Sequence, residues 1–188
     1  MITELAKAKM QEEAKRIEND VHYSAKGHYE EANYWSGLHL LLGVPITIFS
    51  AIAGASALAP FDNHAVFAGF LAIIAATLSG IMTFLHPDKK ATTHQSAGSK
   101  YTTLRNRVRT FSDLRLYVEE SEQELLEELK SLAAQRDELN EASLPISDRA
   151  FKIARKRILE KQVKQQKDFQ ERTPEKLHEE STLSVPNA

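Results

Sequence analysis

The chain contains no cysteine among its 188 residues, and two long stretches of it contain no charged residue. Without cysteine there is no disulfide, no thiolate metal site and no cysteine nucleophile. A glycine-rich phosphate loop is also missing, since Ala97-Gly98-Ser99-Lys100 lacks the P-loop pattern. The seven histidines are not spaced as metal ligands, and no Ser/His/Asp set is indicated. We therefore predict no catalytic residue, no metal site and no cofactor, in a protein that is not an enzyme.

The uncharged stretches are long enough to cross a membrane. No charged residue lies between Glu31 and Asp62, and none lies between Asp62 and Asp88. Within them, residues 36–58 and 65–85 are mostly apolar, and about 20 such residues span a hydrocarbon core of about 30 Å. Two core helices of a soluble domain are the alternative. That alternative is disfavoured, because such helices are usually shorter and carry a polar stripe.

The link between the two spans, Ala59-Pro60-Phe61-Asp62-Asn63-His64, is short enough to force an antiparallel hairpin, and Asp62 or Asn63 can cap the second span. It contains no Lys or Arg, whereas basic residues follow the second span from Lys89 to Arg109. Because positive residues stay inside, we predict a multi-pass protein whose N- and C-termini are both cytoplasmic. Tyr34 and Trp35 precede the first span, where an interfacial aromatic belt is expected.

Outside the hairpin the sequence predicts only helices. The expected segments are an amphipathic helix in 1–33 with possible bends at Gly27 and Gly37, the hairpin in 34–86, a long helix in 87–142, a basic helix in 143–172, and a tail without fixed structure in 173–188. The fold class is thus an all-α membrane protein. Its two-helix transmembrane hairpin carries long cytoplasmic helices that form a helical bundle, in an oligomer.

The long helix carries an apolar stripe whose steps alternate between three and four residues. Its members are Tyr101, Leu104, Val108, Phe111, Leu114, Val118, Leu125, Leu129, Leu132 and Leu139. Such a seam needs a partner, either the N-terminal helix or a neighbouring subunit. An acidic run, Glu119, Glu120, Glu122, Glu124, Glu127 and Glu128, is a solvated face or a partner for the basic helix. The basic helix could instead bind anionic lipid or nucleotide phosphates.

Each span has a face of small or polar residues. The first carries His39, Gly43, Thr47, Ser50 and Gly54, and the second carries Ala68, Ala72, Ala76 and Gly80. Close helix packing explains the second face best, because small residues let backbones approach in lipid. The first face is the candidate pore lining, since polar groups facing lipid are costly. Two helices cannot enclose a water path alone, so a pore requires several copies.

A cluster just beyond the second span mixes an aromatic ring with cations. Its members are Lys100, Tyr101, Arg105 and Arg109, with Arg107 beside them. Such a set can clamp phosphates and stack a base, so these four residues are the candidate ligand site. The alternative is that the cations only obey the positive-inside rule.

The layout resembles that of the SLATT family of bacterial membrane effectors. The resemblance covers about Glu12 to Leu132. It rests on the polar-aromatic stretch His28-Tyr29-Glu30-Glu31-Ala32-Asn33-Tyr34-Trp35, on Gly43-Val44-Pro45 in the first span, and on His94-Gln95-Ser96-Ala97-Gly98-Ser99-Lys100-Tyr101 followed by Leu104-Arg105.

The resemblance implies a function in phage defence. Members of that family are thought to oligomerise in the bacterial inner membrane, where a nucleotide signal from a partner nucleotidyltransferase controls a pore. For this chain it implies a lipid-embedded homo-oligomer, with a tetramer weakly favoured, that senses the signal at Lys100, Tyr101, Arg105 and Arg109. The alternative is a membrane-anchored scaffold that recruits a soluble partner through its coiled cytoplasmic helices.

Overall fold

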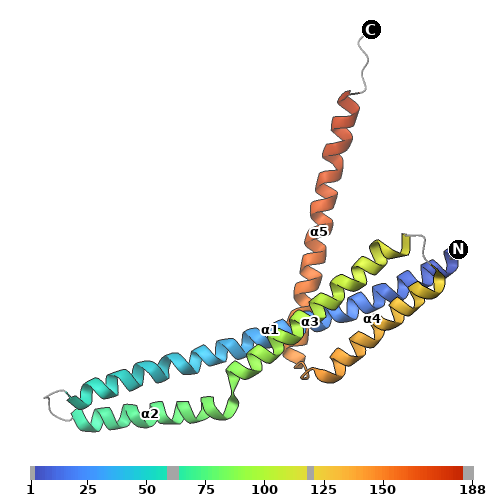
Figure 1. Cartoon of the computed structure of the whole chain (residues 1–188). Helices are drawn as coiled ribbons and strands as arrows, with labels where there is room; N and C mark the ends of the chain where they lie inside the picture. The colour runs from blue at the N-terminus through green and yellow to red at the C-terminus, as the bar shows by residue number, and fades with distance from the viewer. Residues whose placement is uncertain (1–2, 59–63, 118–120, 184–188) are drawn as a thin grey trace.

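In the computed structural model, every regular element in the described part of the chain is helical, as the sequence predicts (Figure 1). The structure describes residues 3–58, 64–117 and 121–183, and it gives only the helical backbone at 64 and 169–183. The elements are α1 (Glu4–Leu58), α2 (His64–Leu85), α3 (Pro87–Asp113), η1 (Arg115–Tyr117), α4 (Glu122–Ala142) and α5 (Asp148–Leu183). The candidate caps Asp62 and Asn63, and Glu119 and Glu120 of the acidic run, lie outside the described residues.

Helix α1 joins two segments that the sequence analysis separates. It runs for 55 residues, through the predicted N-terminal helix and the predicted first span, and it continues unbroken through Gly27 and Gly37. A single glycine costs a helix only about 1 kcal/mol and leaves the backbone hydrogen bonds in place. At about 1.5 Å per residue, α1 is roughly 80 Å long.

Helices α1 and α2 lie side by side at one end of the molecule (Figure 1). Each of the two spans is long and apolar enough to cross a membrane. Their large apolar side chains point away from the protein: Leu41 is 68% exposed, Ile73 is 68% exposed and Phe84 is 86% exposed. A core helix of a soluble domain would bury such residues, so this exposure favours a lipid environment.

The second span ends at His86, where Pro87 predicts a break. His86 has φ 46° and ψ 52°, the left-handed conformation, and Pro87 begins α3. The ring of a proline disfavours the α conformation in the residue before it. A non-glycine residue in the left-handed region costs about 1–2 kcal/mol. The break lets α3 leave the direction of α2 and still return along α1 (Figure 1).

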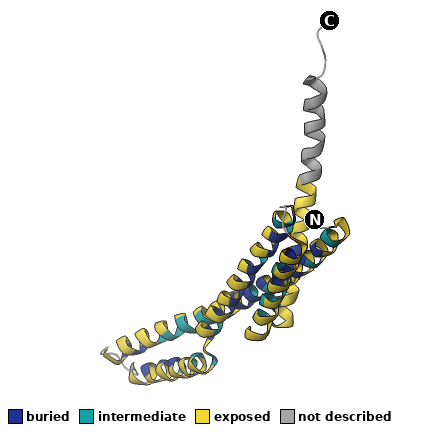
Figure 2. Cartoon of the chain, turned by 45° about the vertical axis from the view of Figure 1, so that its right-hand side comes forward, coloured by how far each residue is buried: buried dark blue, intermediate teal, exposed yellow. Residues whose placement is uncertain are grey.

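The core of the molecule lies at the other end, where α3 and α4 pack along the first half of α1. Buried residues concentrate there, whereas the hairpin is mostly exposed (Figure 2). The buried cluster contains Met10, Ala14, Ile17, Val21 and Ala25 from α1, Tyr101, Leu104, Val108 and Phe111 from α3, Leu116 from η1, and Leu125, Leu129 and Leu132 from α4. The N-terminal helix therefore covers the predicted apolar seam within one chain. Leu114 departs from the seam, since it is 63% exposed, and Val118 lies outside the described residues.

The prediction of one long helix over 87–142 is wrong, because this segment forms two helices that lie antiparallel to each other. Helix α3 ends at Asp113, and α4 begins at Glu122 and runs antiparallel to α3. Arg107 Nη1 donates to Gln135 Oε1 at 3.0 Å, and Arg115 Nε donates to Glu128 Oε2 at 3.2 Å. The start of α4 is a capping box: Ser121 Oγ accepts from the Glu124 amide at 3.2 Å, and the Glu124 carboxylate accepts from the Ser121 amide at 3.3 Å. This signal is present in the sequence and outweighs the continuous seam.

The basic helix is longer than predicted. Helix α5 begins at Asp148, as the Ser147 N-cap indicates, and it continues to Leu183. Most of the segment predicted to lack fixed structure, 173–188, is therefore helical, and 184–188 lies outside the described residues. Glu, Lys and Leu dominate residues 175–183, and these residue types have high helix propensity.

Replacing Phe111 tests the buried core formed by α1, α3 and α4. Phe111 is fully buried between α1 and η1–α4, so Phe111→Ala should lower the free energy of unfolding by about 3–5 kcal/mol. The matched control is Leu114→Ala on the same turn, whose side chain is 63% exposed and whose loss should be below about 1 kcal/mol. The measurement is urea unfolding of the full chain in detergent, followed by circular dichroism. Equal losses for the two variants would contradict this core.

Candidate functional site

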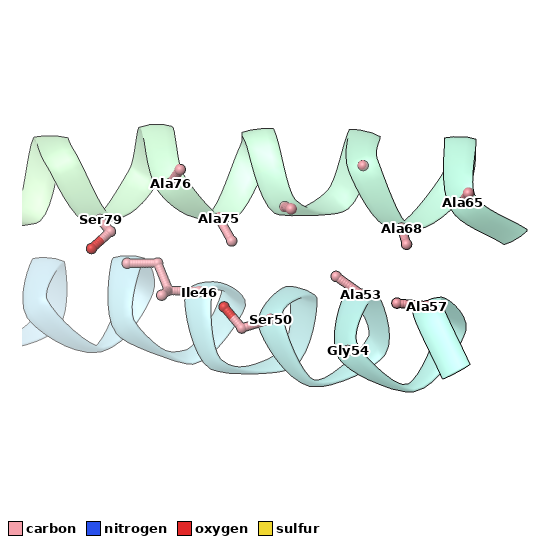
Figure 3. A pocket seen from close by; sticks show the side chains of 12 residues that line it. Ile46, Ser50, Ala53, Gly54, Ala57, Ala65, Ala68, Ala75, Ala76 and Ser79 are labelled. Carbon is pink, nitrogen blue, oxygen red and sulfur yellow. The ribbon is translucent and has the colours of Figure 1, made fainter. Parts of the chain in front are cut away.

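A groove runs between α1 and α2 towards the far end of the hairpin (Figure 3). Its volume is about 740 Å³. Small side chains line most of it: Ser50, Ala53, Gly54, Ala57, Ala65, Ala68, Gly69, Ala72, Ala75, Ala76 and Ser79, with Ile46 as the large exception. The hydroxyl of Ser50 points towards α2 and that of Ser79 towards α1 (Figure 3). Because these side chains are small, the groove between the two spans stays open within one chain.

The candidate pore residues of α1 do not all share one environment. Ser50 and Gly54 line the groove, and Thr47 is exposed, with its hydroxyl donating to the Gly43 carbonyl at 2.9 Å. Gly43 faces α2, because a Cβ built on it would lie 3.8 Å from Met82 Cε. His39 is half-buried, and its Nδ1 is shielded without a hydrogen-bond partner among the described residues. The outer half of the row, from Thr47 to Gly54, is therefore the part open to a neighbouring chain.

The small-residue face of α2 is rotated from the predicted packing position. Ala68 is buried against α1, but Ala72, Ala76 and Gly80 are exposed, and a Cβ on Gly80 would meet nothing within 4 Å. The residues buried in their place are Leu71, with 9% of its surface exposed, and Ala75, with 6%. The contact thus steps from Ala68 through Leu71 to Ala75, and the remaining small residues stay unpartnered within the chain.

A buried histidine pair joins α1 to α3 just below the spans. The Nδ1 atoms of His28 and His94 lie 2.9 Å apart, and the His28 ring stacks on Tyr101 at 5.4 Å. One nitrogen must donate and the other must accept, so at least one of the two rings must be neutral. Burial, followed by the nearby His94, lowers the pKa of His28 to about 4, although Glu31 opposes this shift. Burial likewise lowers the pKa of His94, again against the effect of Glu31.

Glu31 fastens the start of α5 to α1. It is 4% exposed, and its Oε1 accepts hydrogen bonds from both the amide and the hydroxyl of Ser147. Burial alone would raise the pKa of Glu31, but the hydrogen bonds from Ser147, together with the nearby His94 and Arg149, hold that pKa below its ordinary value. Beside it, Gly27 lets Ile146 approach α1, since a Cβ there would lie 2.9 Å from Ile146 Cδ1. The link between α4 and α5 is thereby fixed on the continuous helix.

The four candidate ligand residues are distributed over three environments. Tyr101 is 2% exposed, and its hydroxyl donates to Asn140 Oδ1 at 2.8 Å, so its ring belongs to the core. Lys100 lines a cavity of about 340 Å³ beside the histidine pair. Arg105 and Arg109 line a different and larger cavity, which also contains residues of α5. Only the two arginines are brought together.

This larger cavity, the cationic cleft, has a volume of about 610 Å³ between α1, α3 and α5. It is lined by Glu18, Asn19, His22 and Lys26 of α1, by Arg105 and Arg109 of α3, and by Arg157, Ile158, Lys161, Gln162 and Gln165 of α5. Among these described residues five are basic and one is acidic. Glu18 Oε1 accepts from Arg105 Nε at 3.2 Å and lies 3.9 Å from Arg109 Nε. The cleft therefore has an excess of positive charge.

Burial and the surrounding cations both disfavour the protonated form of His22. Burial, followed by Arg105, Lys26 and Lys161, lowers the pKa of His22 to about 4. His22 is consequently neutral at physiological pH and adds a flat, uncharged ring to the wall of the cleft.

The candidate ligand site predicted from the sequence does not include the residues of α5 that line the cleft. Ala150, Ala154 and Ile158 are buried and recur every fourth residue, so they define the face of α5 that packs on α1. Arg157 and Lys161 flank that face, and Arg157 pairs with Glu30. The four-residue repeat of Ala150, Ala154 and Ile158 is the signal in the sequence that could have placed these cations next to α1.

Comparison of the chain with protein-family models, with curated proteins and with solved structures returned no match. The resemblance to the SLATT family consequently stays a prediction from the layout of the sequence.

The histidine pair predicts a loss of stability in acid. Between about pH 6.5 and pH 4 the unfolded chain binds protons at His28 and His94 that the folded chain excludes, so the free energy of unfolding falls as the pH falls. Thermal midpoints of the full chain in detergent should be level above about pH 6.5 and should drop steadily below it.

The variant His28→Gln should flatten part of this drop, because glutamine keeps a polar contact with His94 but does not titrate. The control is His86→Asn, an exposed position whose left-handed backbone asparagine tolerates. An identical pH profile in His28→Gln and His86→Asn would contradict the role of the pair.

Proposed function

We propose that this protein is an oligomeric membrane pore, or ion-channel effector, that a nucleotide-type signal controls from the cytoplasm. Its action would be to disrupt the bacterial inner membrane in defence against phage. The observation that carries the proposal is the continuity of α1, which forms one wall of the cationic cleft and also forms the first span. A ligand that binds among the cytoplasmic helices therefore acts directly on a helix of the pore.

The proposed orientation places the cytoplasmic core, the cationic cleft and α5 inside the cell. Its support is the distribution of basic residues, which are missing from the link 59–63 and dense after the second span. Two aromatic rings just before the first span each make a cation–π contact. Lys90 Nζ lies 4.2 Å from the centroid of the Trp35 ring, and Arg149 Cζ lies 3.8 Å from the centroid of the Tyr34 ring. Such rings with flanking cations are typical of the membrane–water interface.

Oligomerisation through the hairpin would use the small residues left open in one chain. Ala72, Ala76 and Gly80 are exposed on α2, and the first two line the groove opposite Ser50 and Gly54 of α1. In lipid, close backbone approach and interhelical hydrogen bonds drive helix association, and small residues permit both. Copies arranged around an axis, with a tetramer as our first expectation, would turn Thr47 and Ser50 away from lipid and towards a shared path.

The scaffold alternative has a weaker basis in this fold. Its recruiting surface was the apolar seam, of which Leu104, Val108, Phe111, Leu125, Leu129 and Leu132 are buried within the chain. A buried seam is not available to a soluble partner unless the cytoplasmic core opens.

A liposome assay tests the pore. Purified protein in liposomes should release trapped ions, either constitutively or in response to added nucleotide. Thr47→Leu and Ser50→Leu should change that release by about tenfold or more, because each replaces a polar group on the proposed path with a bulky apolar one. The matched controls are Val44→Leu and Ile48→Leu, at exposed apolar positions on the same helix.

The controls should leave the leak within about twofold of the wild-type value, since lipid-facing apolar exchanges are tolerated. Liposomes that stay tight with protein present, both with and without nucleotides, would contradict the pore. Equal effects of the polar-site variants and of the controls would contradict the assignment of the path.

A further inference from the structure

The cationic cleft combines two surfaces that carry the same sign of charge. Arg105 and Arg109 come from α3 with Lys26 from α1, and Arg157 and Lys161 face them from α5. Like charges brought together around a cavity repel one another, and a bound anion relieves this repulsion more strongly than screening by water and salt does. Within the cavity, Glu18 is the one acidic lining residue in the part of the chain that the structure describes. Arg157 also pairs with Glu30 next to the cleft, so the five basic lining residues exceed these two carboxylates by three charges, which an anion can neutralise.

The position of the cleft separates it from lipid phosphates. Lys26 precedes Ser36, where the first span begins, by roughly 15 Å of helix, and Glu18 precedes it by roughly 27 Å. The polar layer on each side of a bilayer is about 5–8 Å thick. The cleft thus lies beyond the reach of lipid headgroups and opens to the soluble phase.

Its lining also offers more than charge. Gln162 and Gln165 supply amide donors and acceptors, and Ile158 and the neutral His22 ring supply flat or apolar contacts. Arginine guanidinium groups bind phosphate with two parallel hydrogen bonds. A volume of about 610 Å³ lies within the range of small-molecule sites, which is about 300–1,000 Å³. A phosphate chain attached to a heterocyclic base fits this combination of contacts.

We propose that the cleft between α1, α3 and α5 binds a soluble nucleotide that carries at least two phosphate charges. The phosphates replace Glu18 as the counter-ion of Arg105 and Arg109, and they also contact Arg157 and Lys161. A ligand in this position ties α5 to α1 and α3. This assignment rests on the proposed control by a nucleotide-type signal, and it names the site and the phosphate chemistry of that ligand. Lys100 and Tyr101 lie outside it.

The test is calorimetric titration of the full chain in phosphatidylcholine nanodiscs, with ATP and inorganic pyrophosphate as probes. Both should bind, and Arg109→Gln and Lys161→Gln should each weaken binding about tenfold or more, because each removes a charge-assisted hydrogen bond. The matched controls are Arg107→Gln and Lys152→Gln, on the same two helices but outside the cleft, and they should bind as the wild type does. Arg109→Lys should retain more affinity than Arg109→Gln, and circular dichroism checks that each variant is folded.

Glu18→Gln supplies a gain of affinity that a non-specific basic surface would not show. Removing the internal counter-ion should tighten binding severalfold, since the phosphates then displace nothing. Equal affinity in the cleft variants and their matched controls, no tightening in Glu18→Gln, or binding that requires phosphatidylglycerol in the nanodisc would each overturn the proposal.

The liposome assay separates this proposal from the pore. A nucleotide-controlled leak that survives Arg109→Gln and Lys161→Gln unchanged would overturn the cleft and leave the pore standing. Specific binding in the cleft together with tight liposomes would support the cleft and overturn the pore.

Discussion

The rest of the structure depends on one constraint, which is that α1 passes from the buried helical core into the hairpin as a single helix. A helix transmits displacement along its axis because its turns are joined by backbone hydrogen bonds, and α1 stays helical through Pro45, whose position in the first span lacks that donor. In its first half α1 provides Ile17 and Val21 to the core, and in its second half it provides the wall of the membrane groove. A shift of α1 in the core is therefore expected to displace the part of α1 that lines the groove.

The second connection between the hairpin and the core, from α2 to α3, is not a continuous helix. Between α2 and α3 the helix breaks at His86, whose backbone is left-handed, so the second span and α3 do not form one rod. The protein thus has one rigid and one articulated link between its two ends. Just inside the break, the His28–His94 contact and the Glu31–Ser147 bonds hold α3 and α5 onto α1.

The helical class, the two spans and the break at Pro87 could be predicted from the sequence, because long uncharged runs and a proline act locally. The continuity of α1 could not, since Gly27 and Gly37 read as bends while the tertiary contacts of α1 favour a straight helix. The end of α3 and the separate start of α4 were not predicted, because the apolar seam keeps its helical spacing from one helix into the next. The Ser121–Glu124 capping box was the signal for the new helix. Of the candidate ligand site, Arg105 and Arg109 were found, but the α5 cations were not, because only folding brings them beside α1.

The most direct test of this account is a distance measured along α1 by electron spin resonance. The chain has no cysteine, so one double variant with Lys15→Cys and Leu40→Cys, both at exposed positions, can carry a spin label at each site without background. With labelled protein diluted into unlabelled protein in lipid, a continuous helix predicts a narrow distribution near roughly 37 Å, from a rise of about 1.5 Å per residue. A broad distribution, or a distance shorter by several ångströms, would show that α1 bends or breaks at the membrane boundary and would contradict the coupling of the two ends.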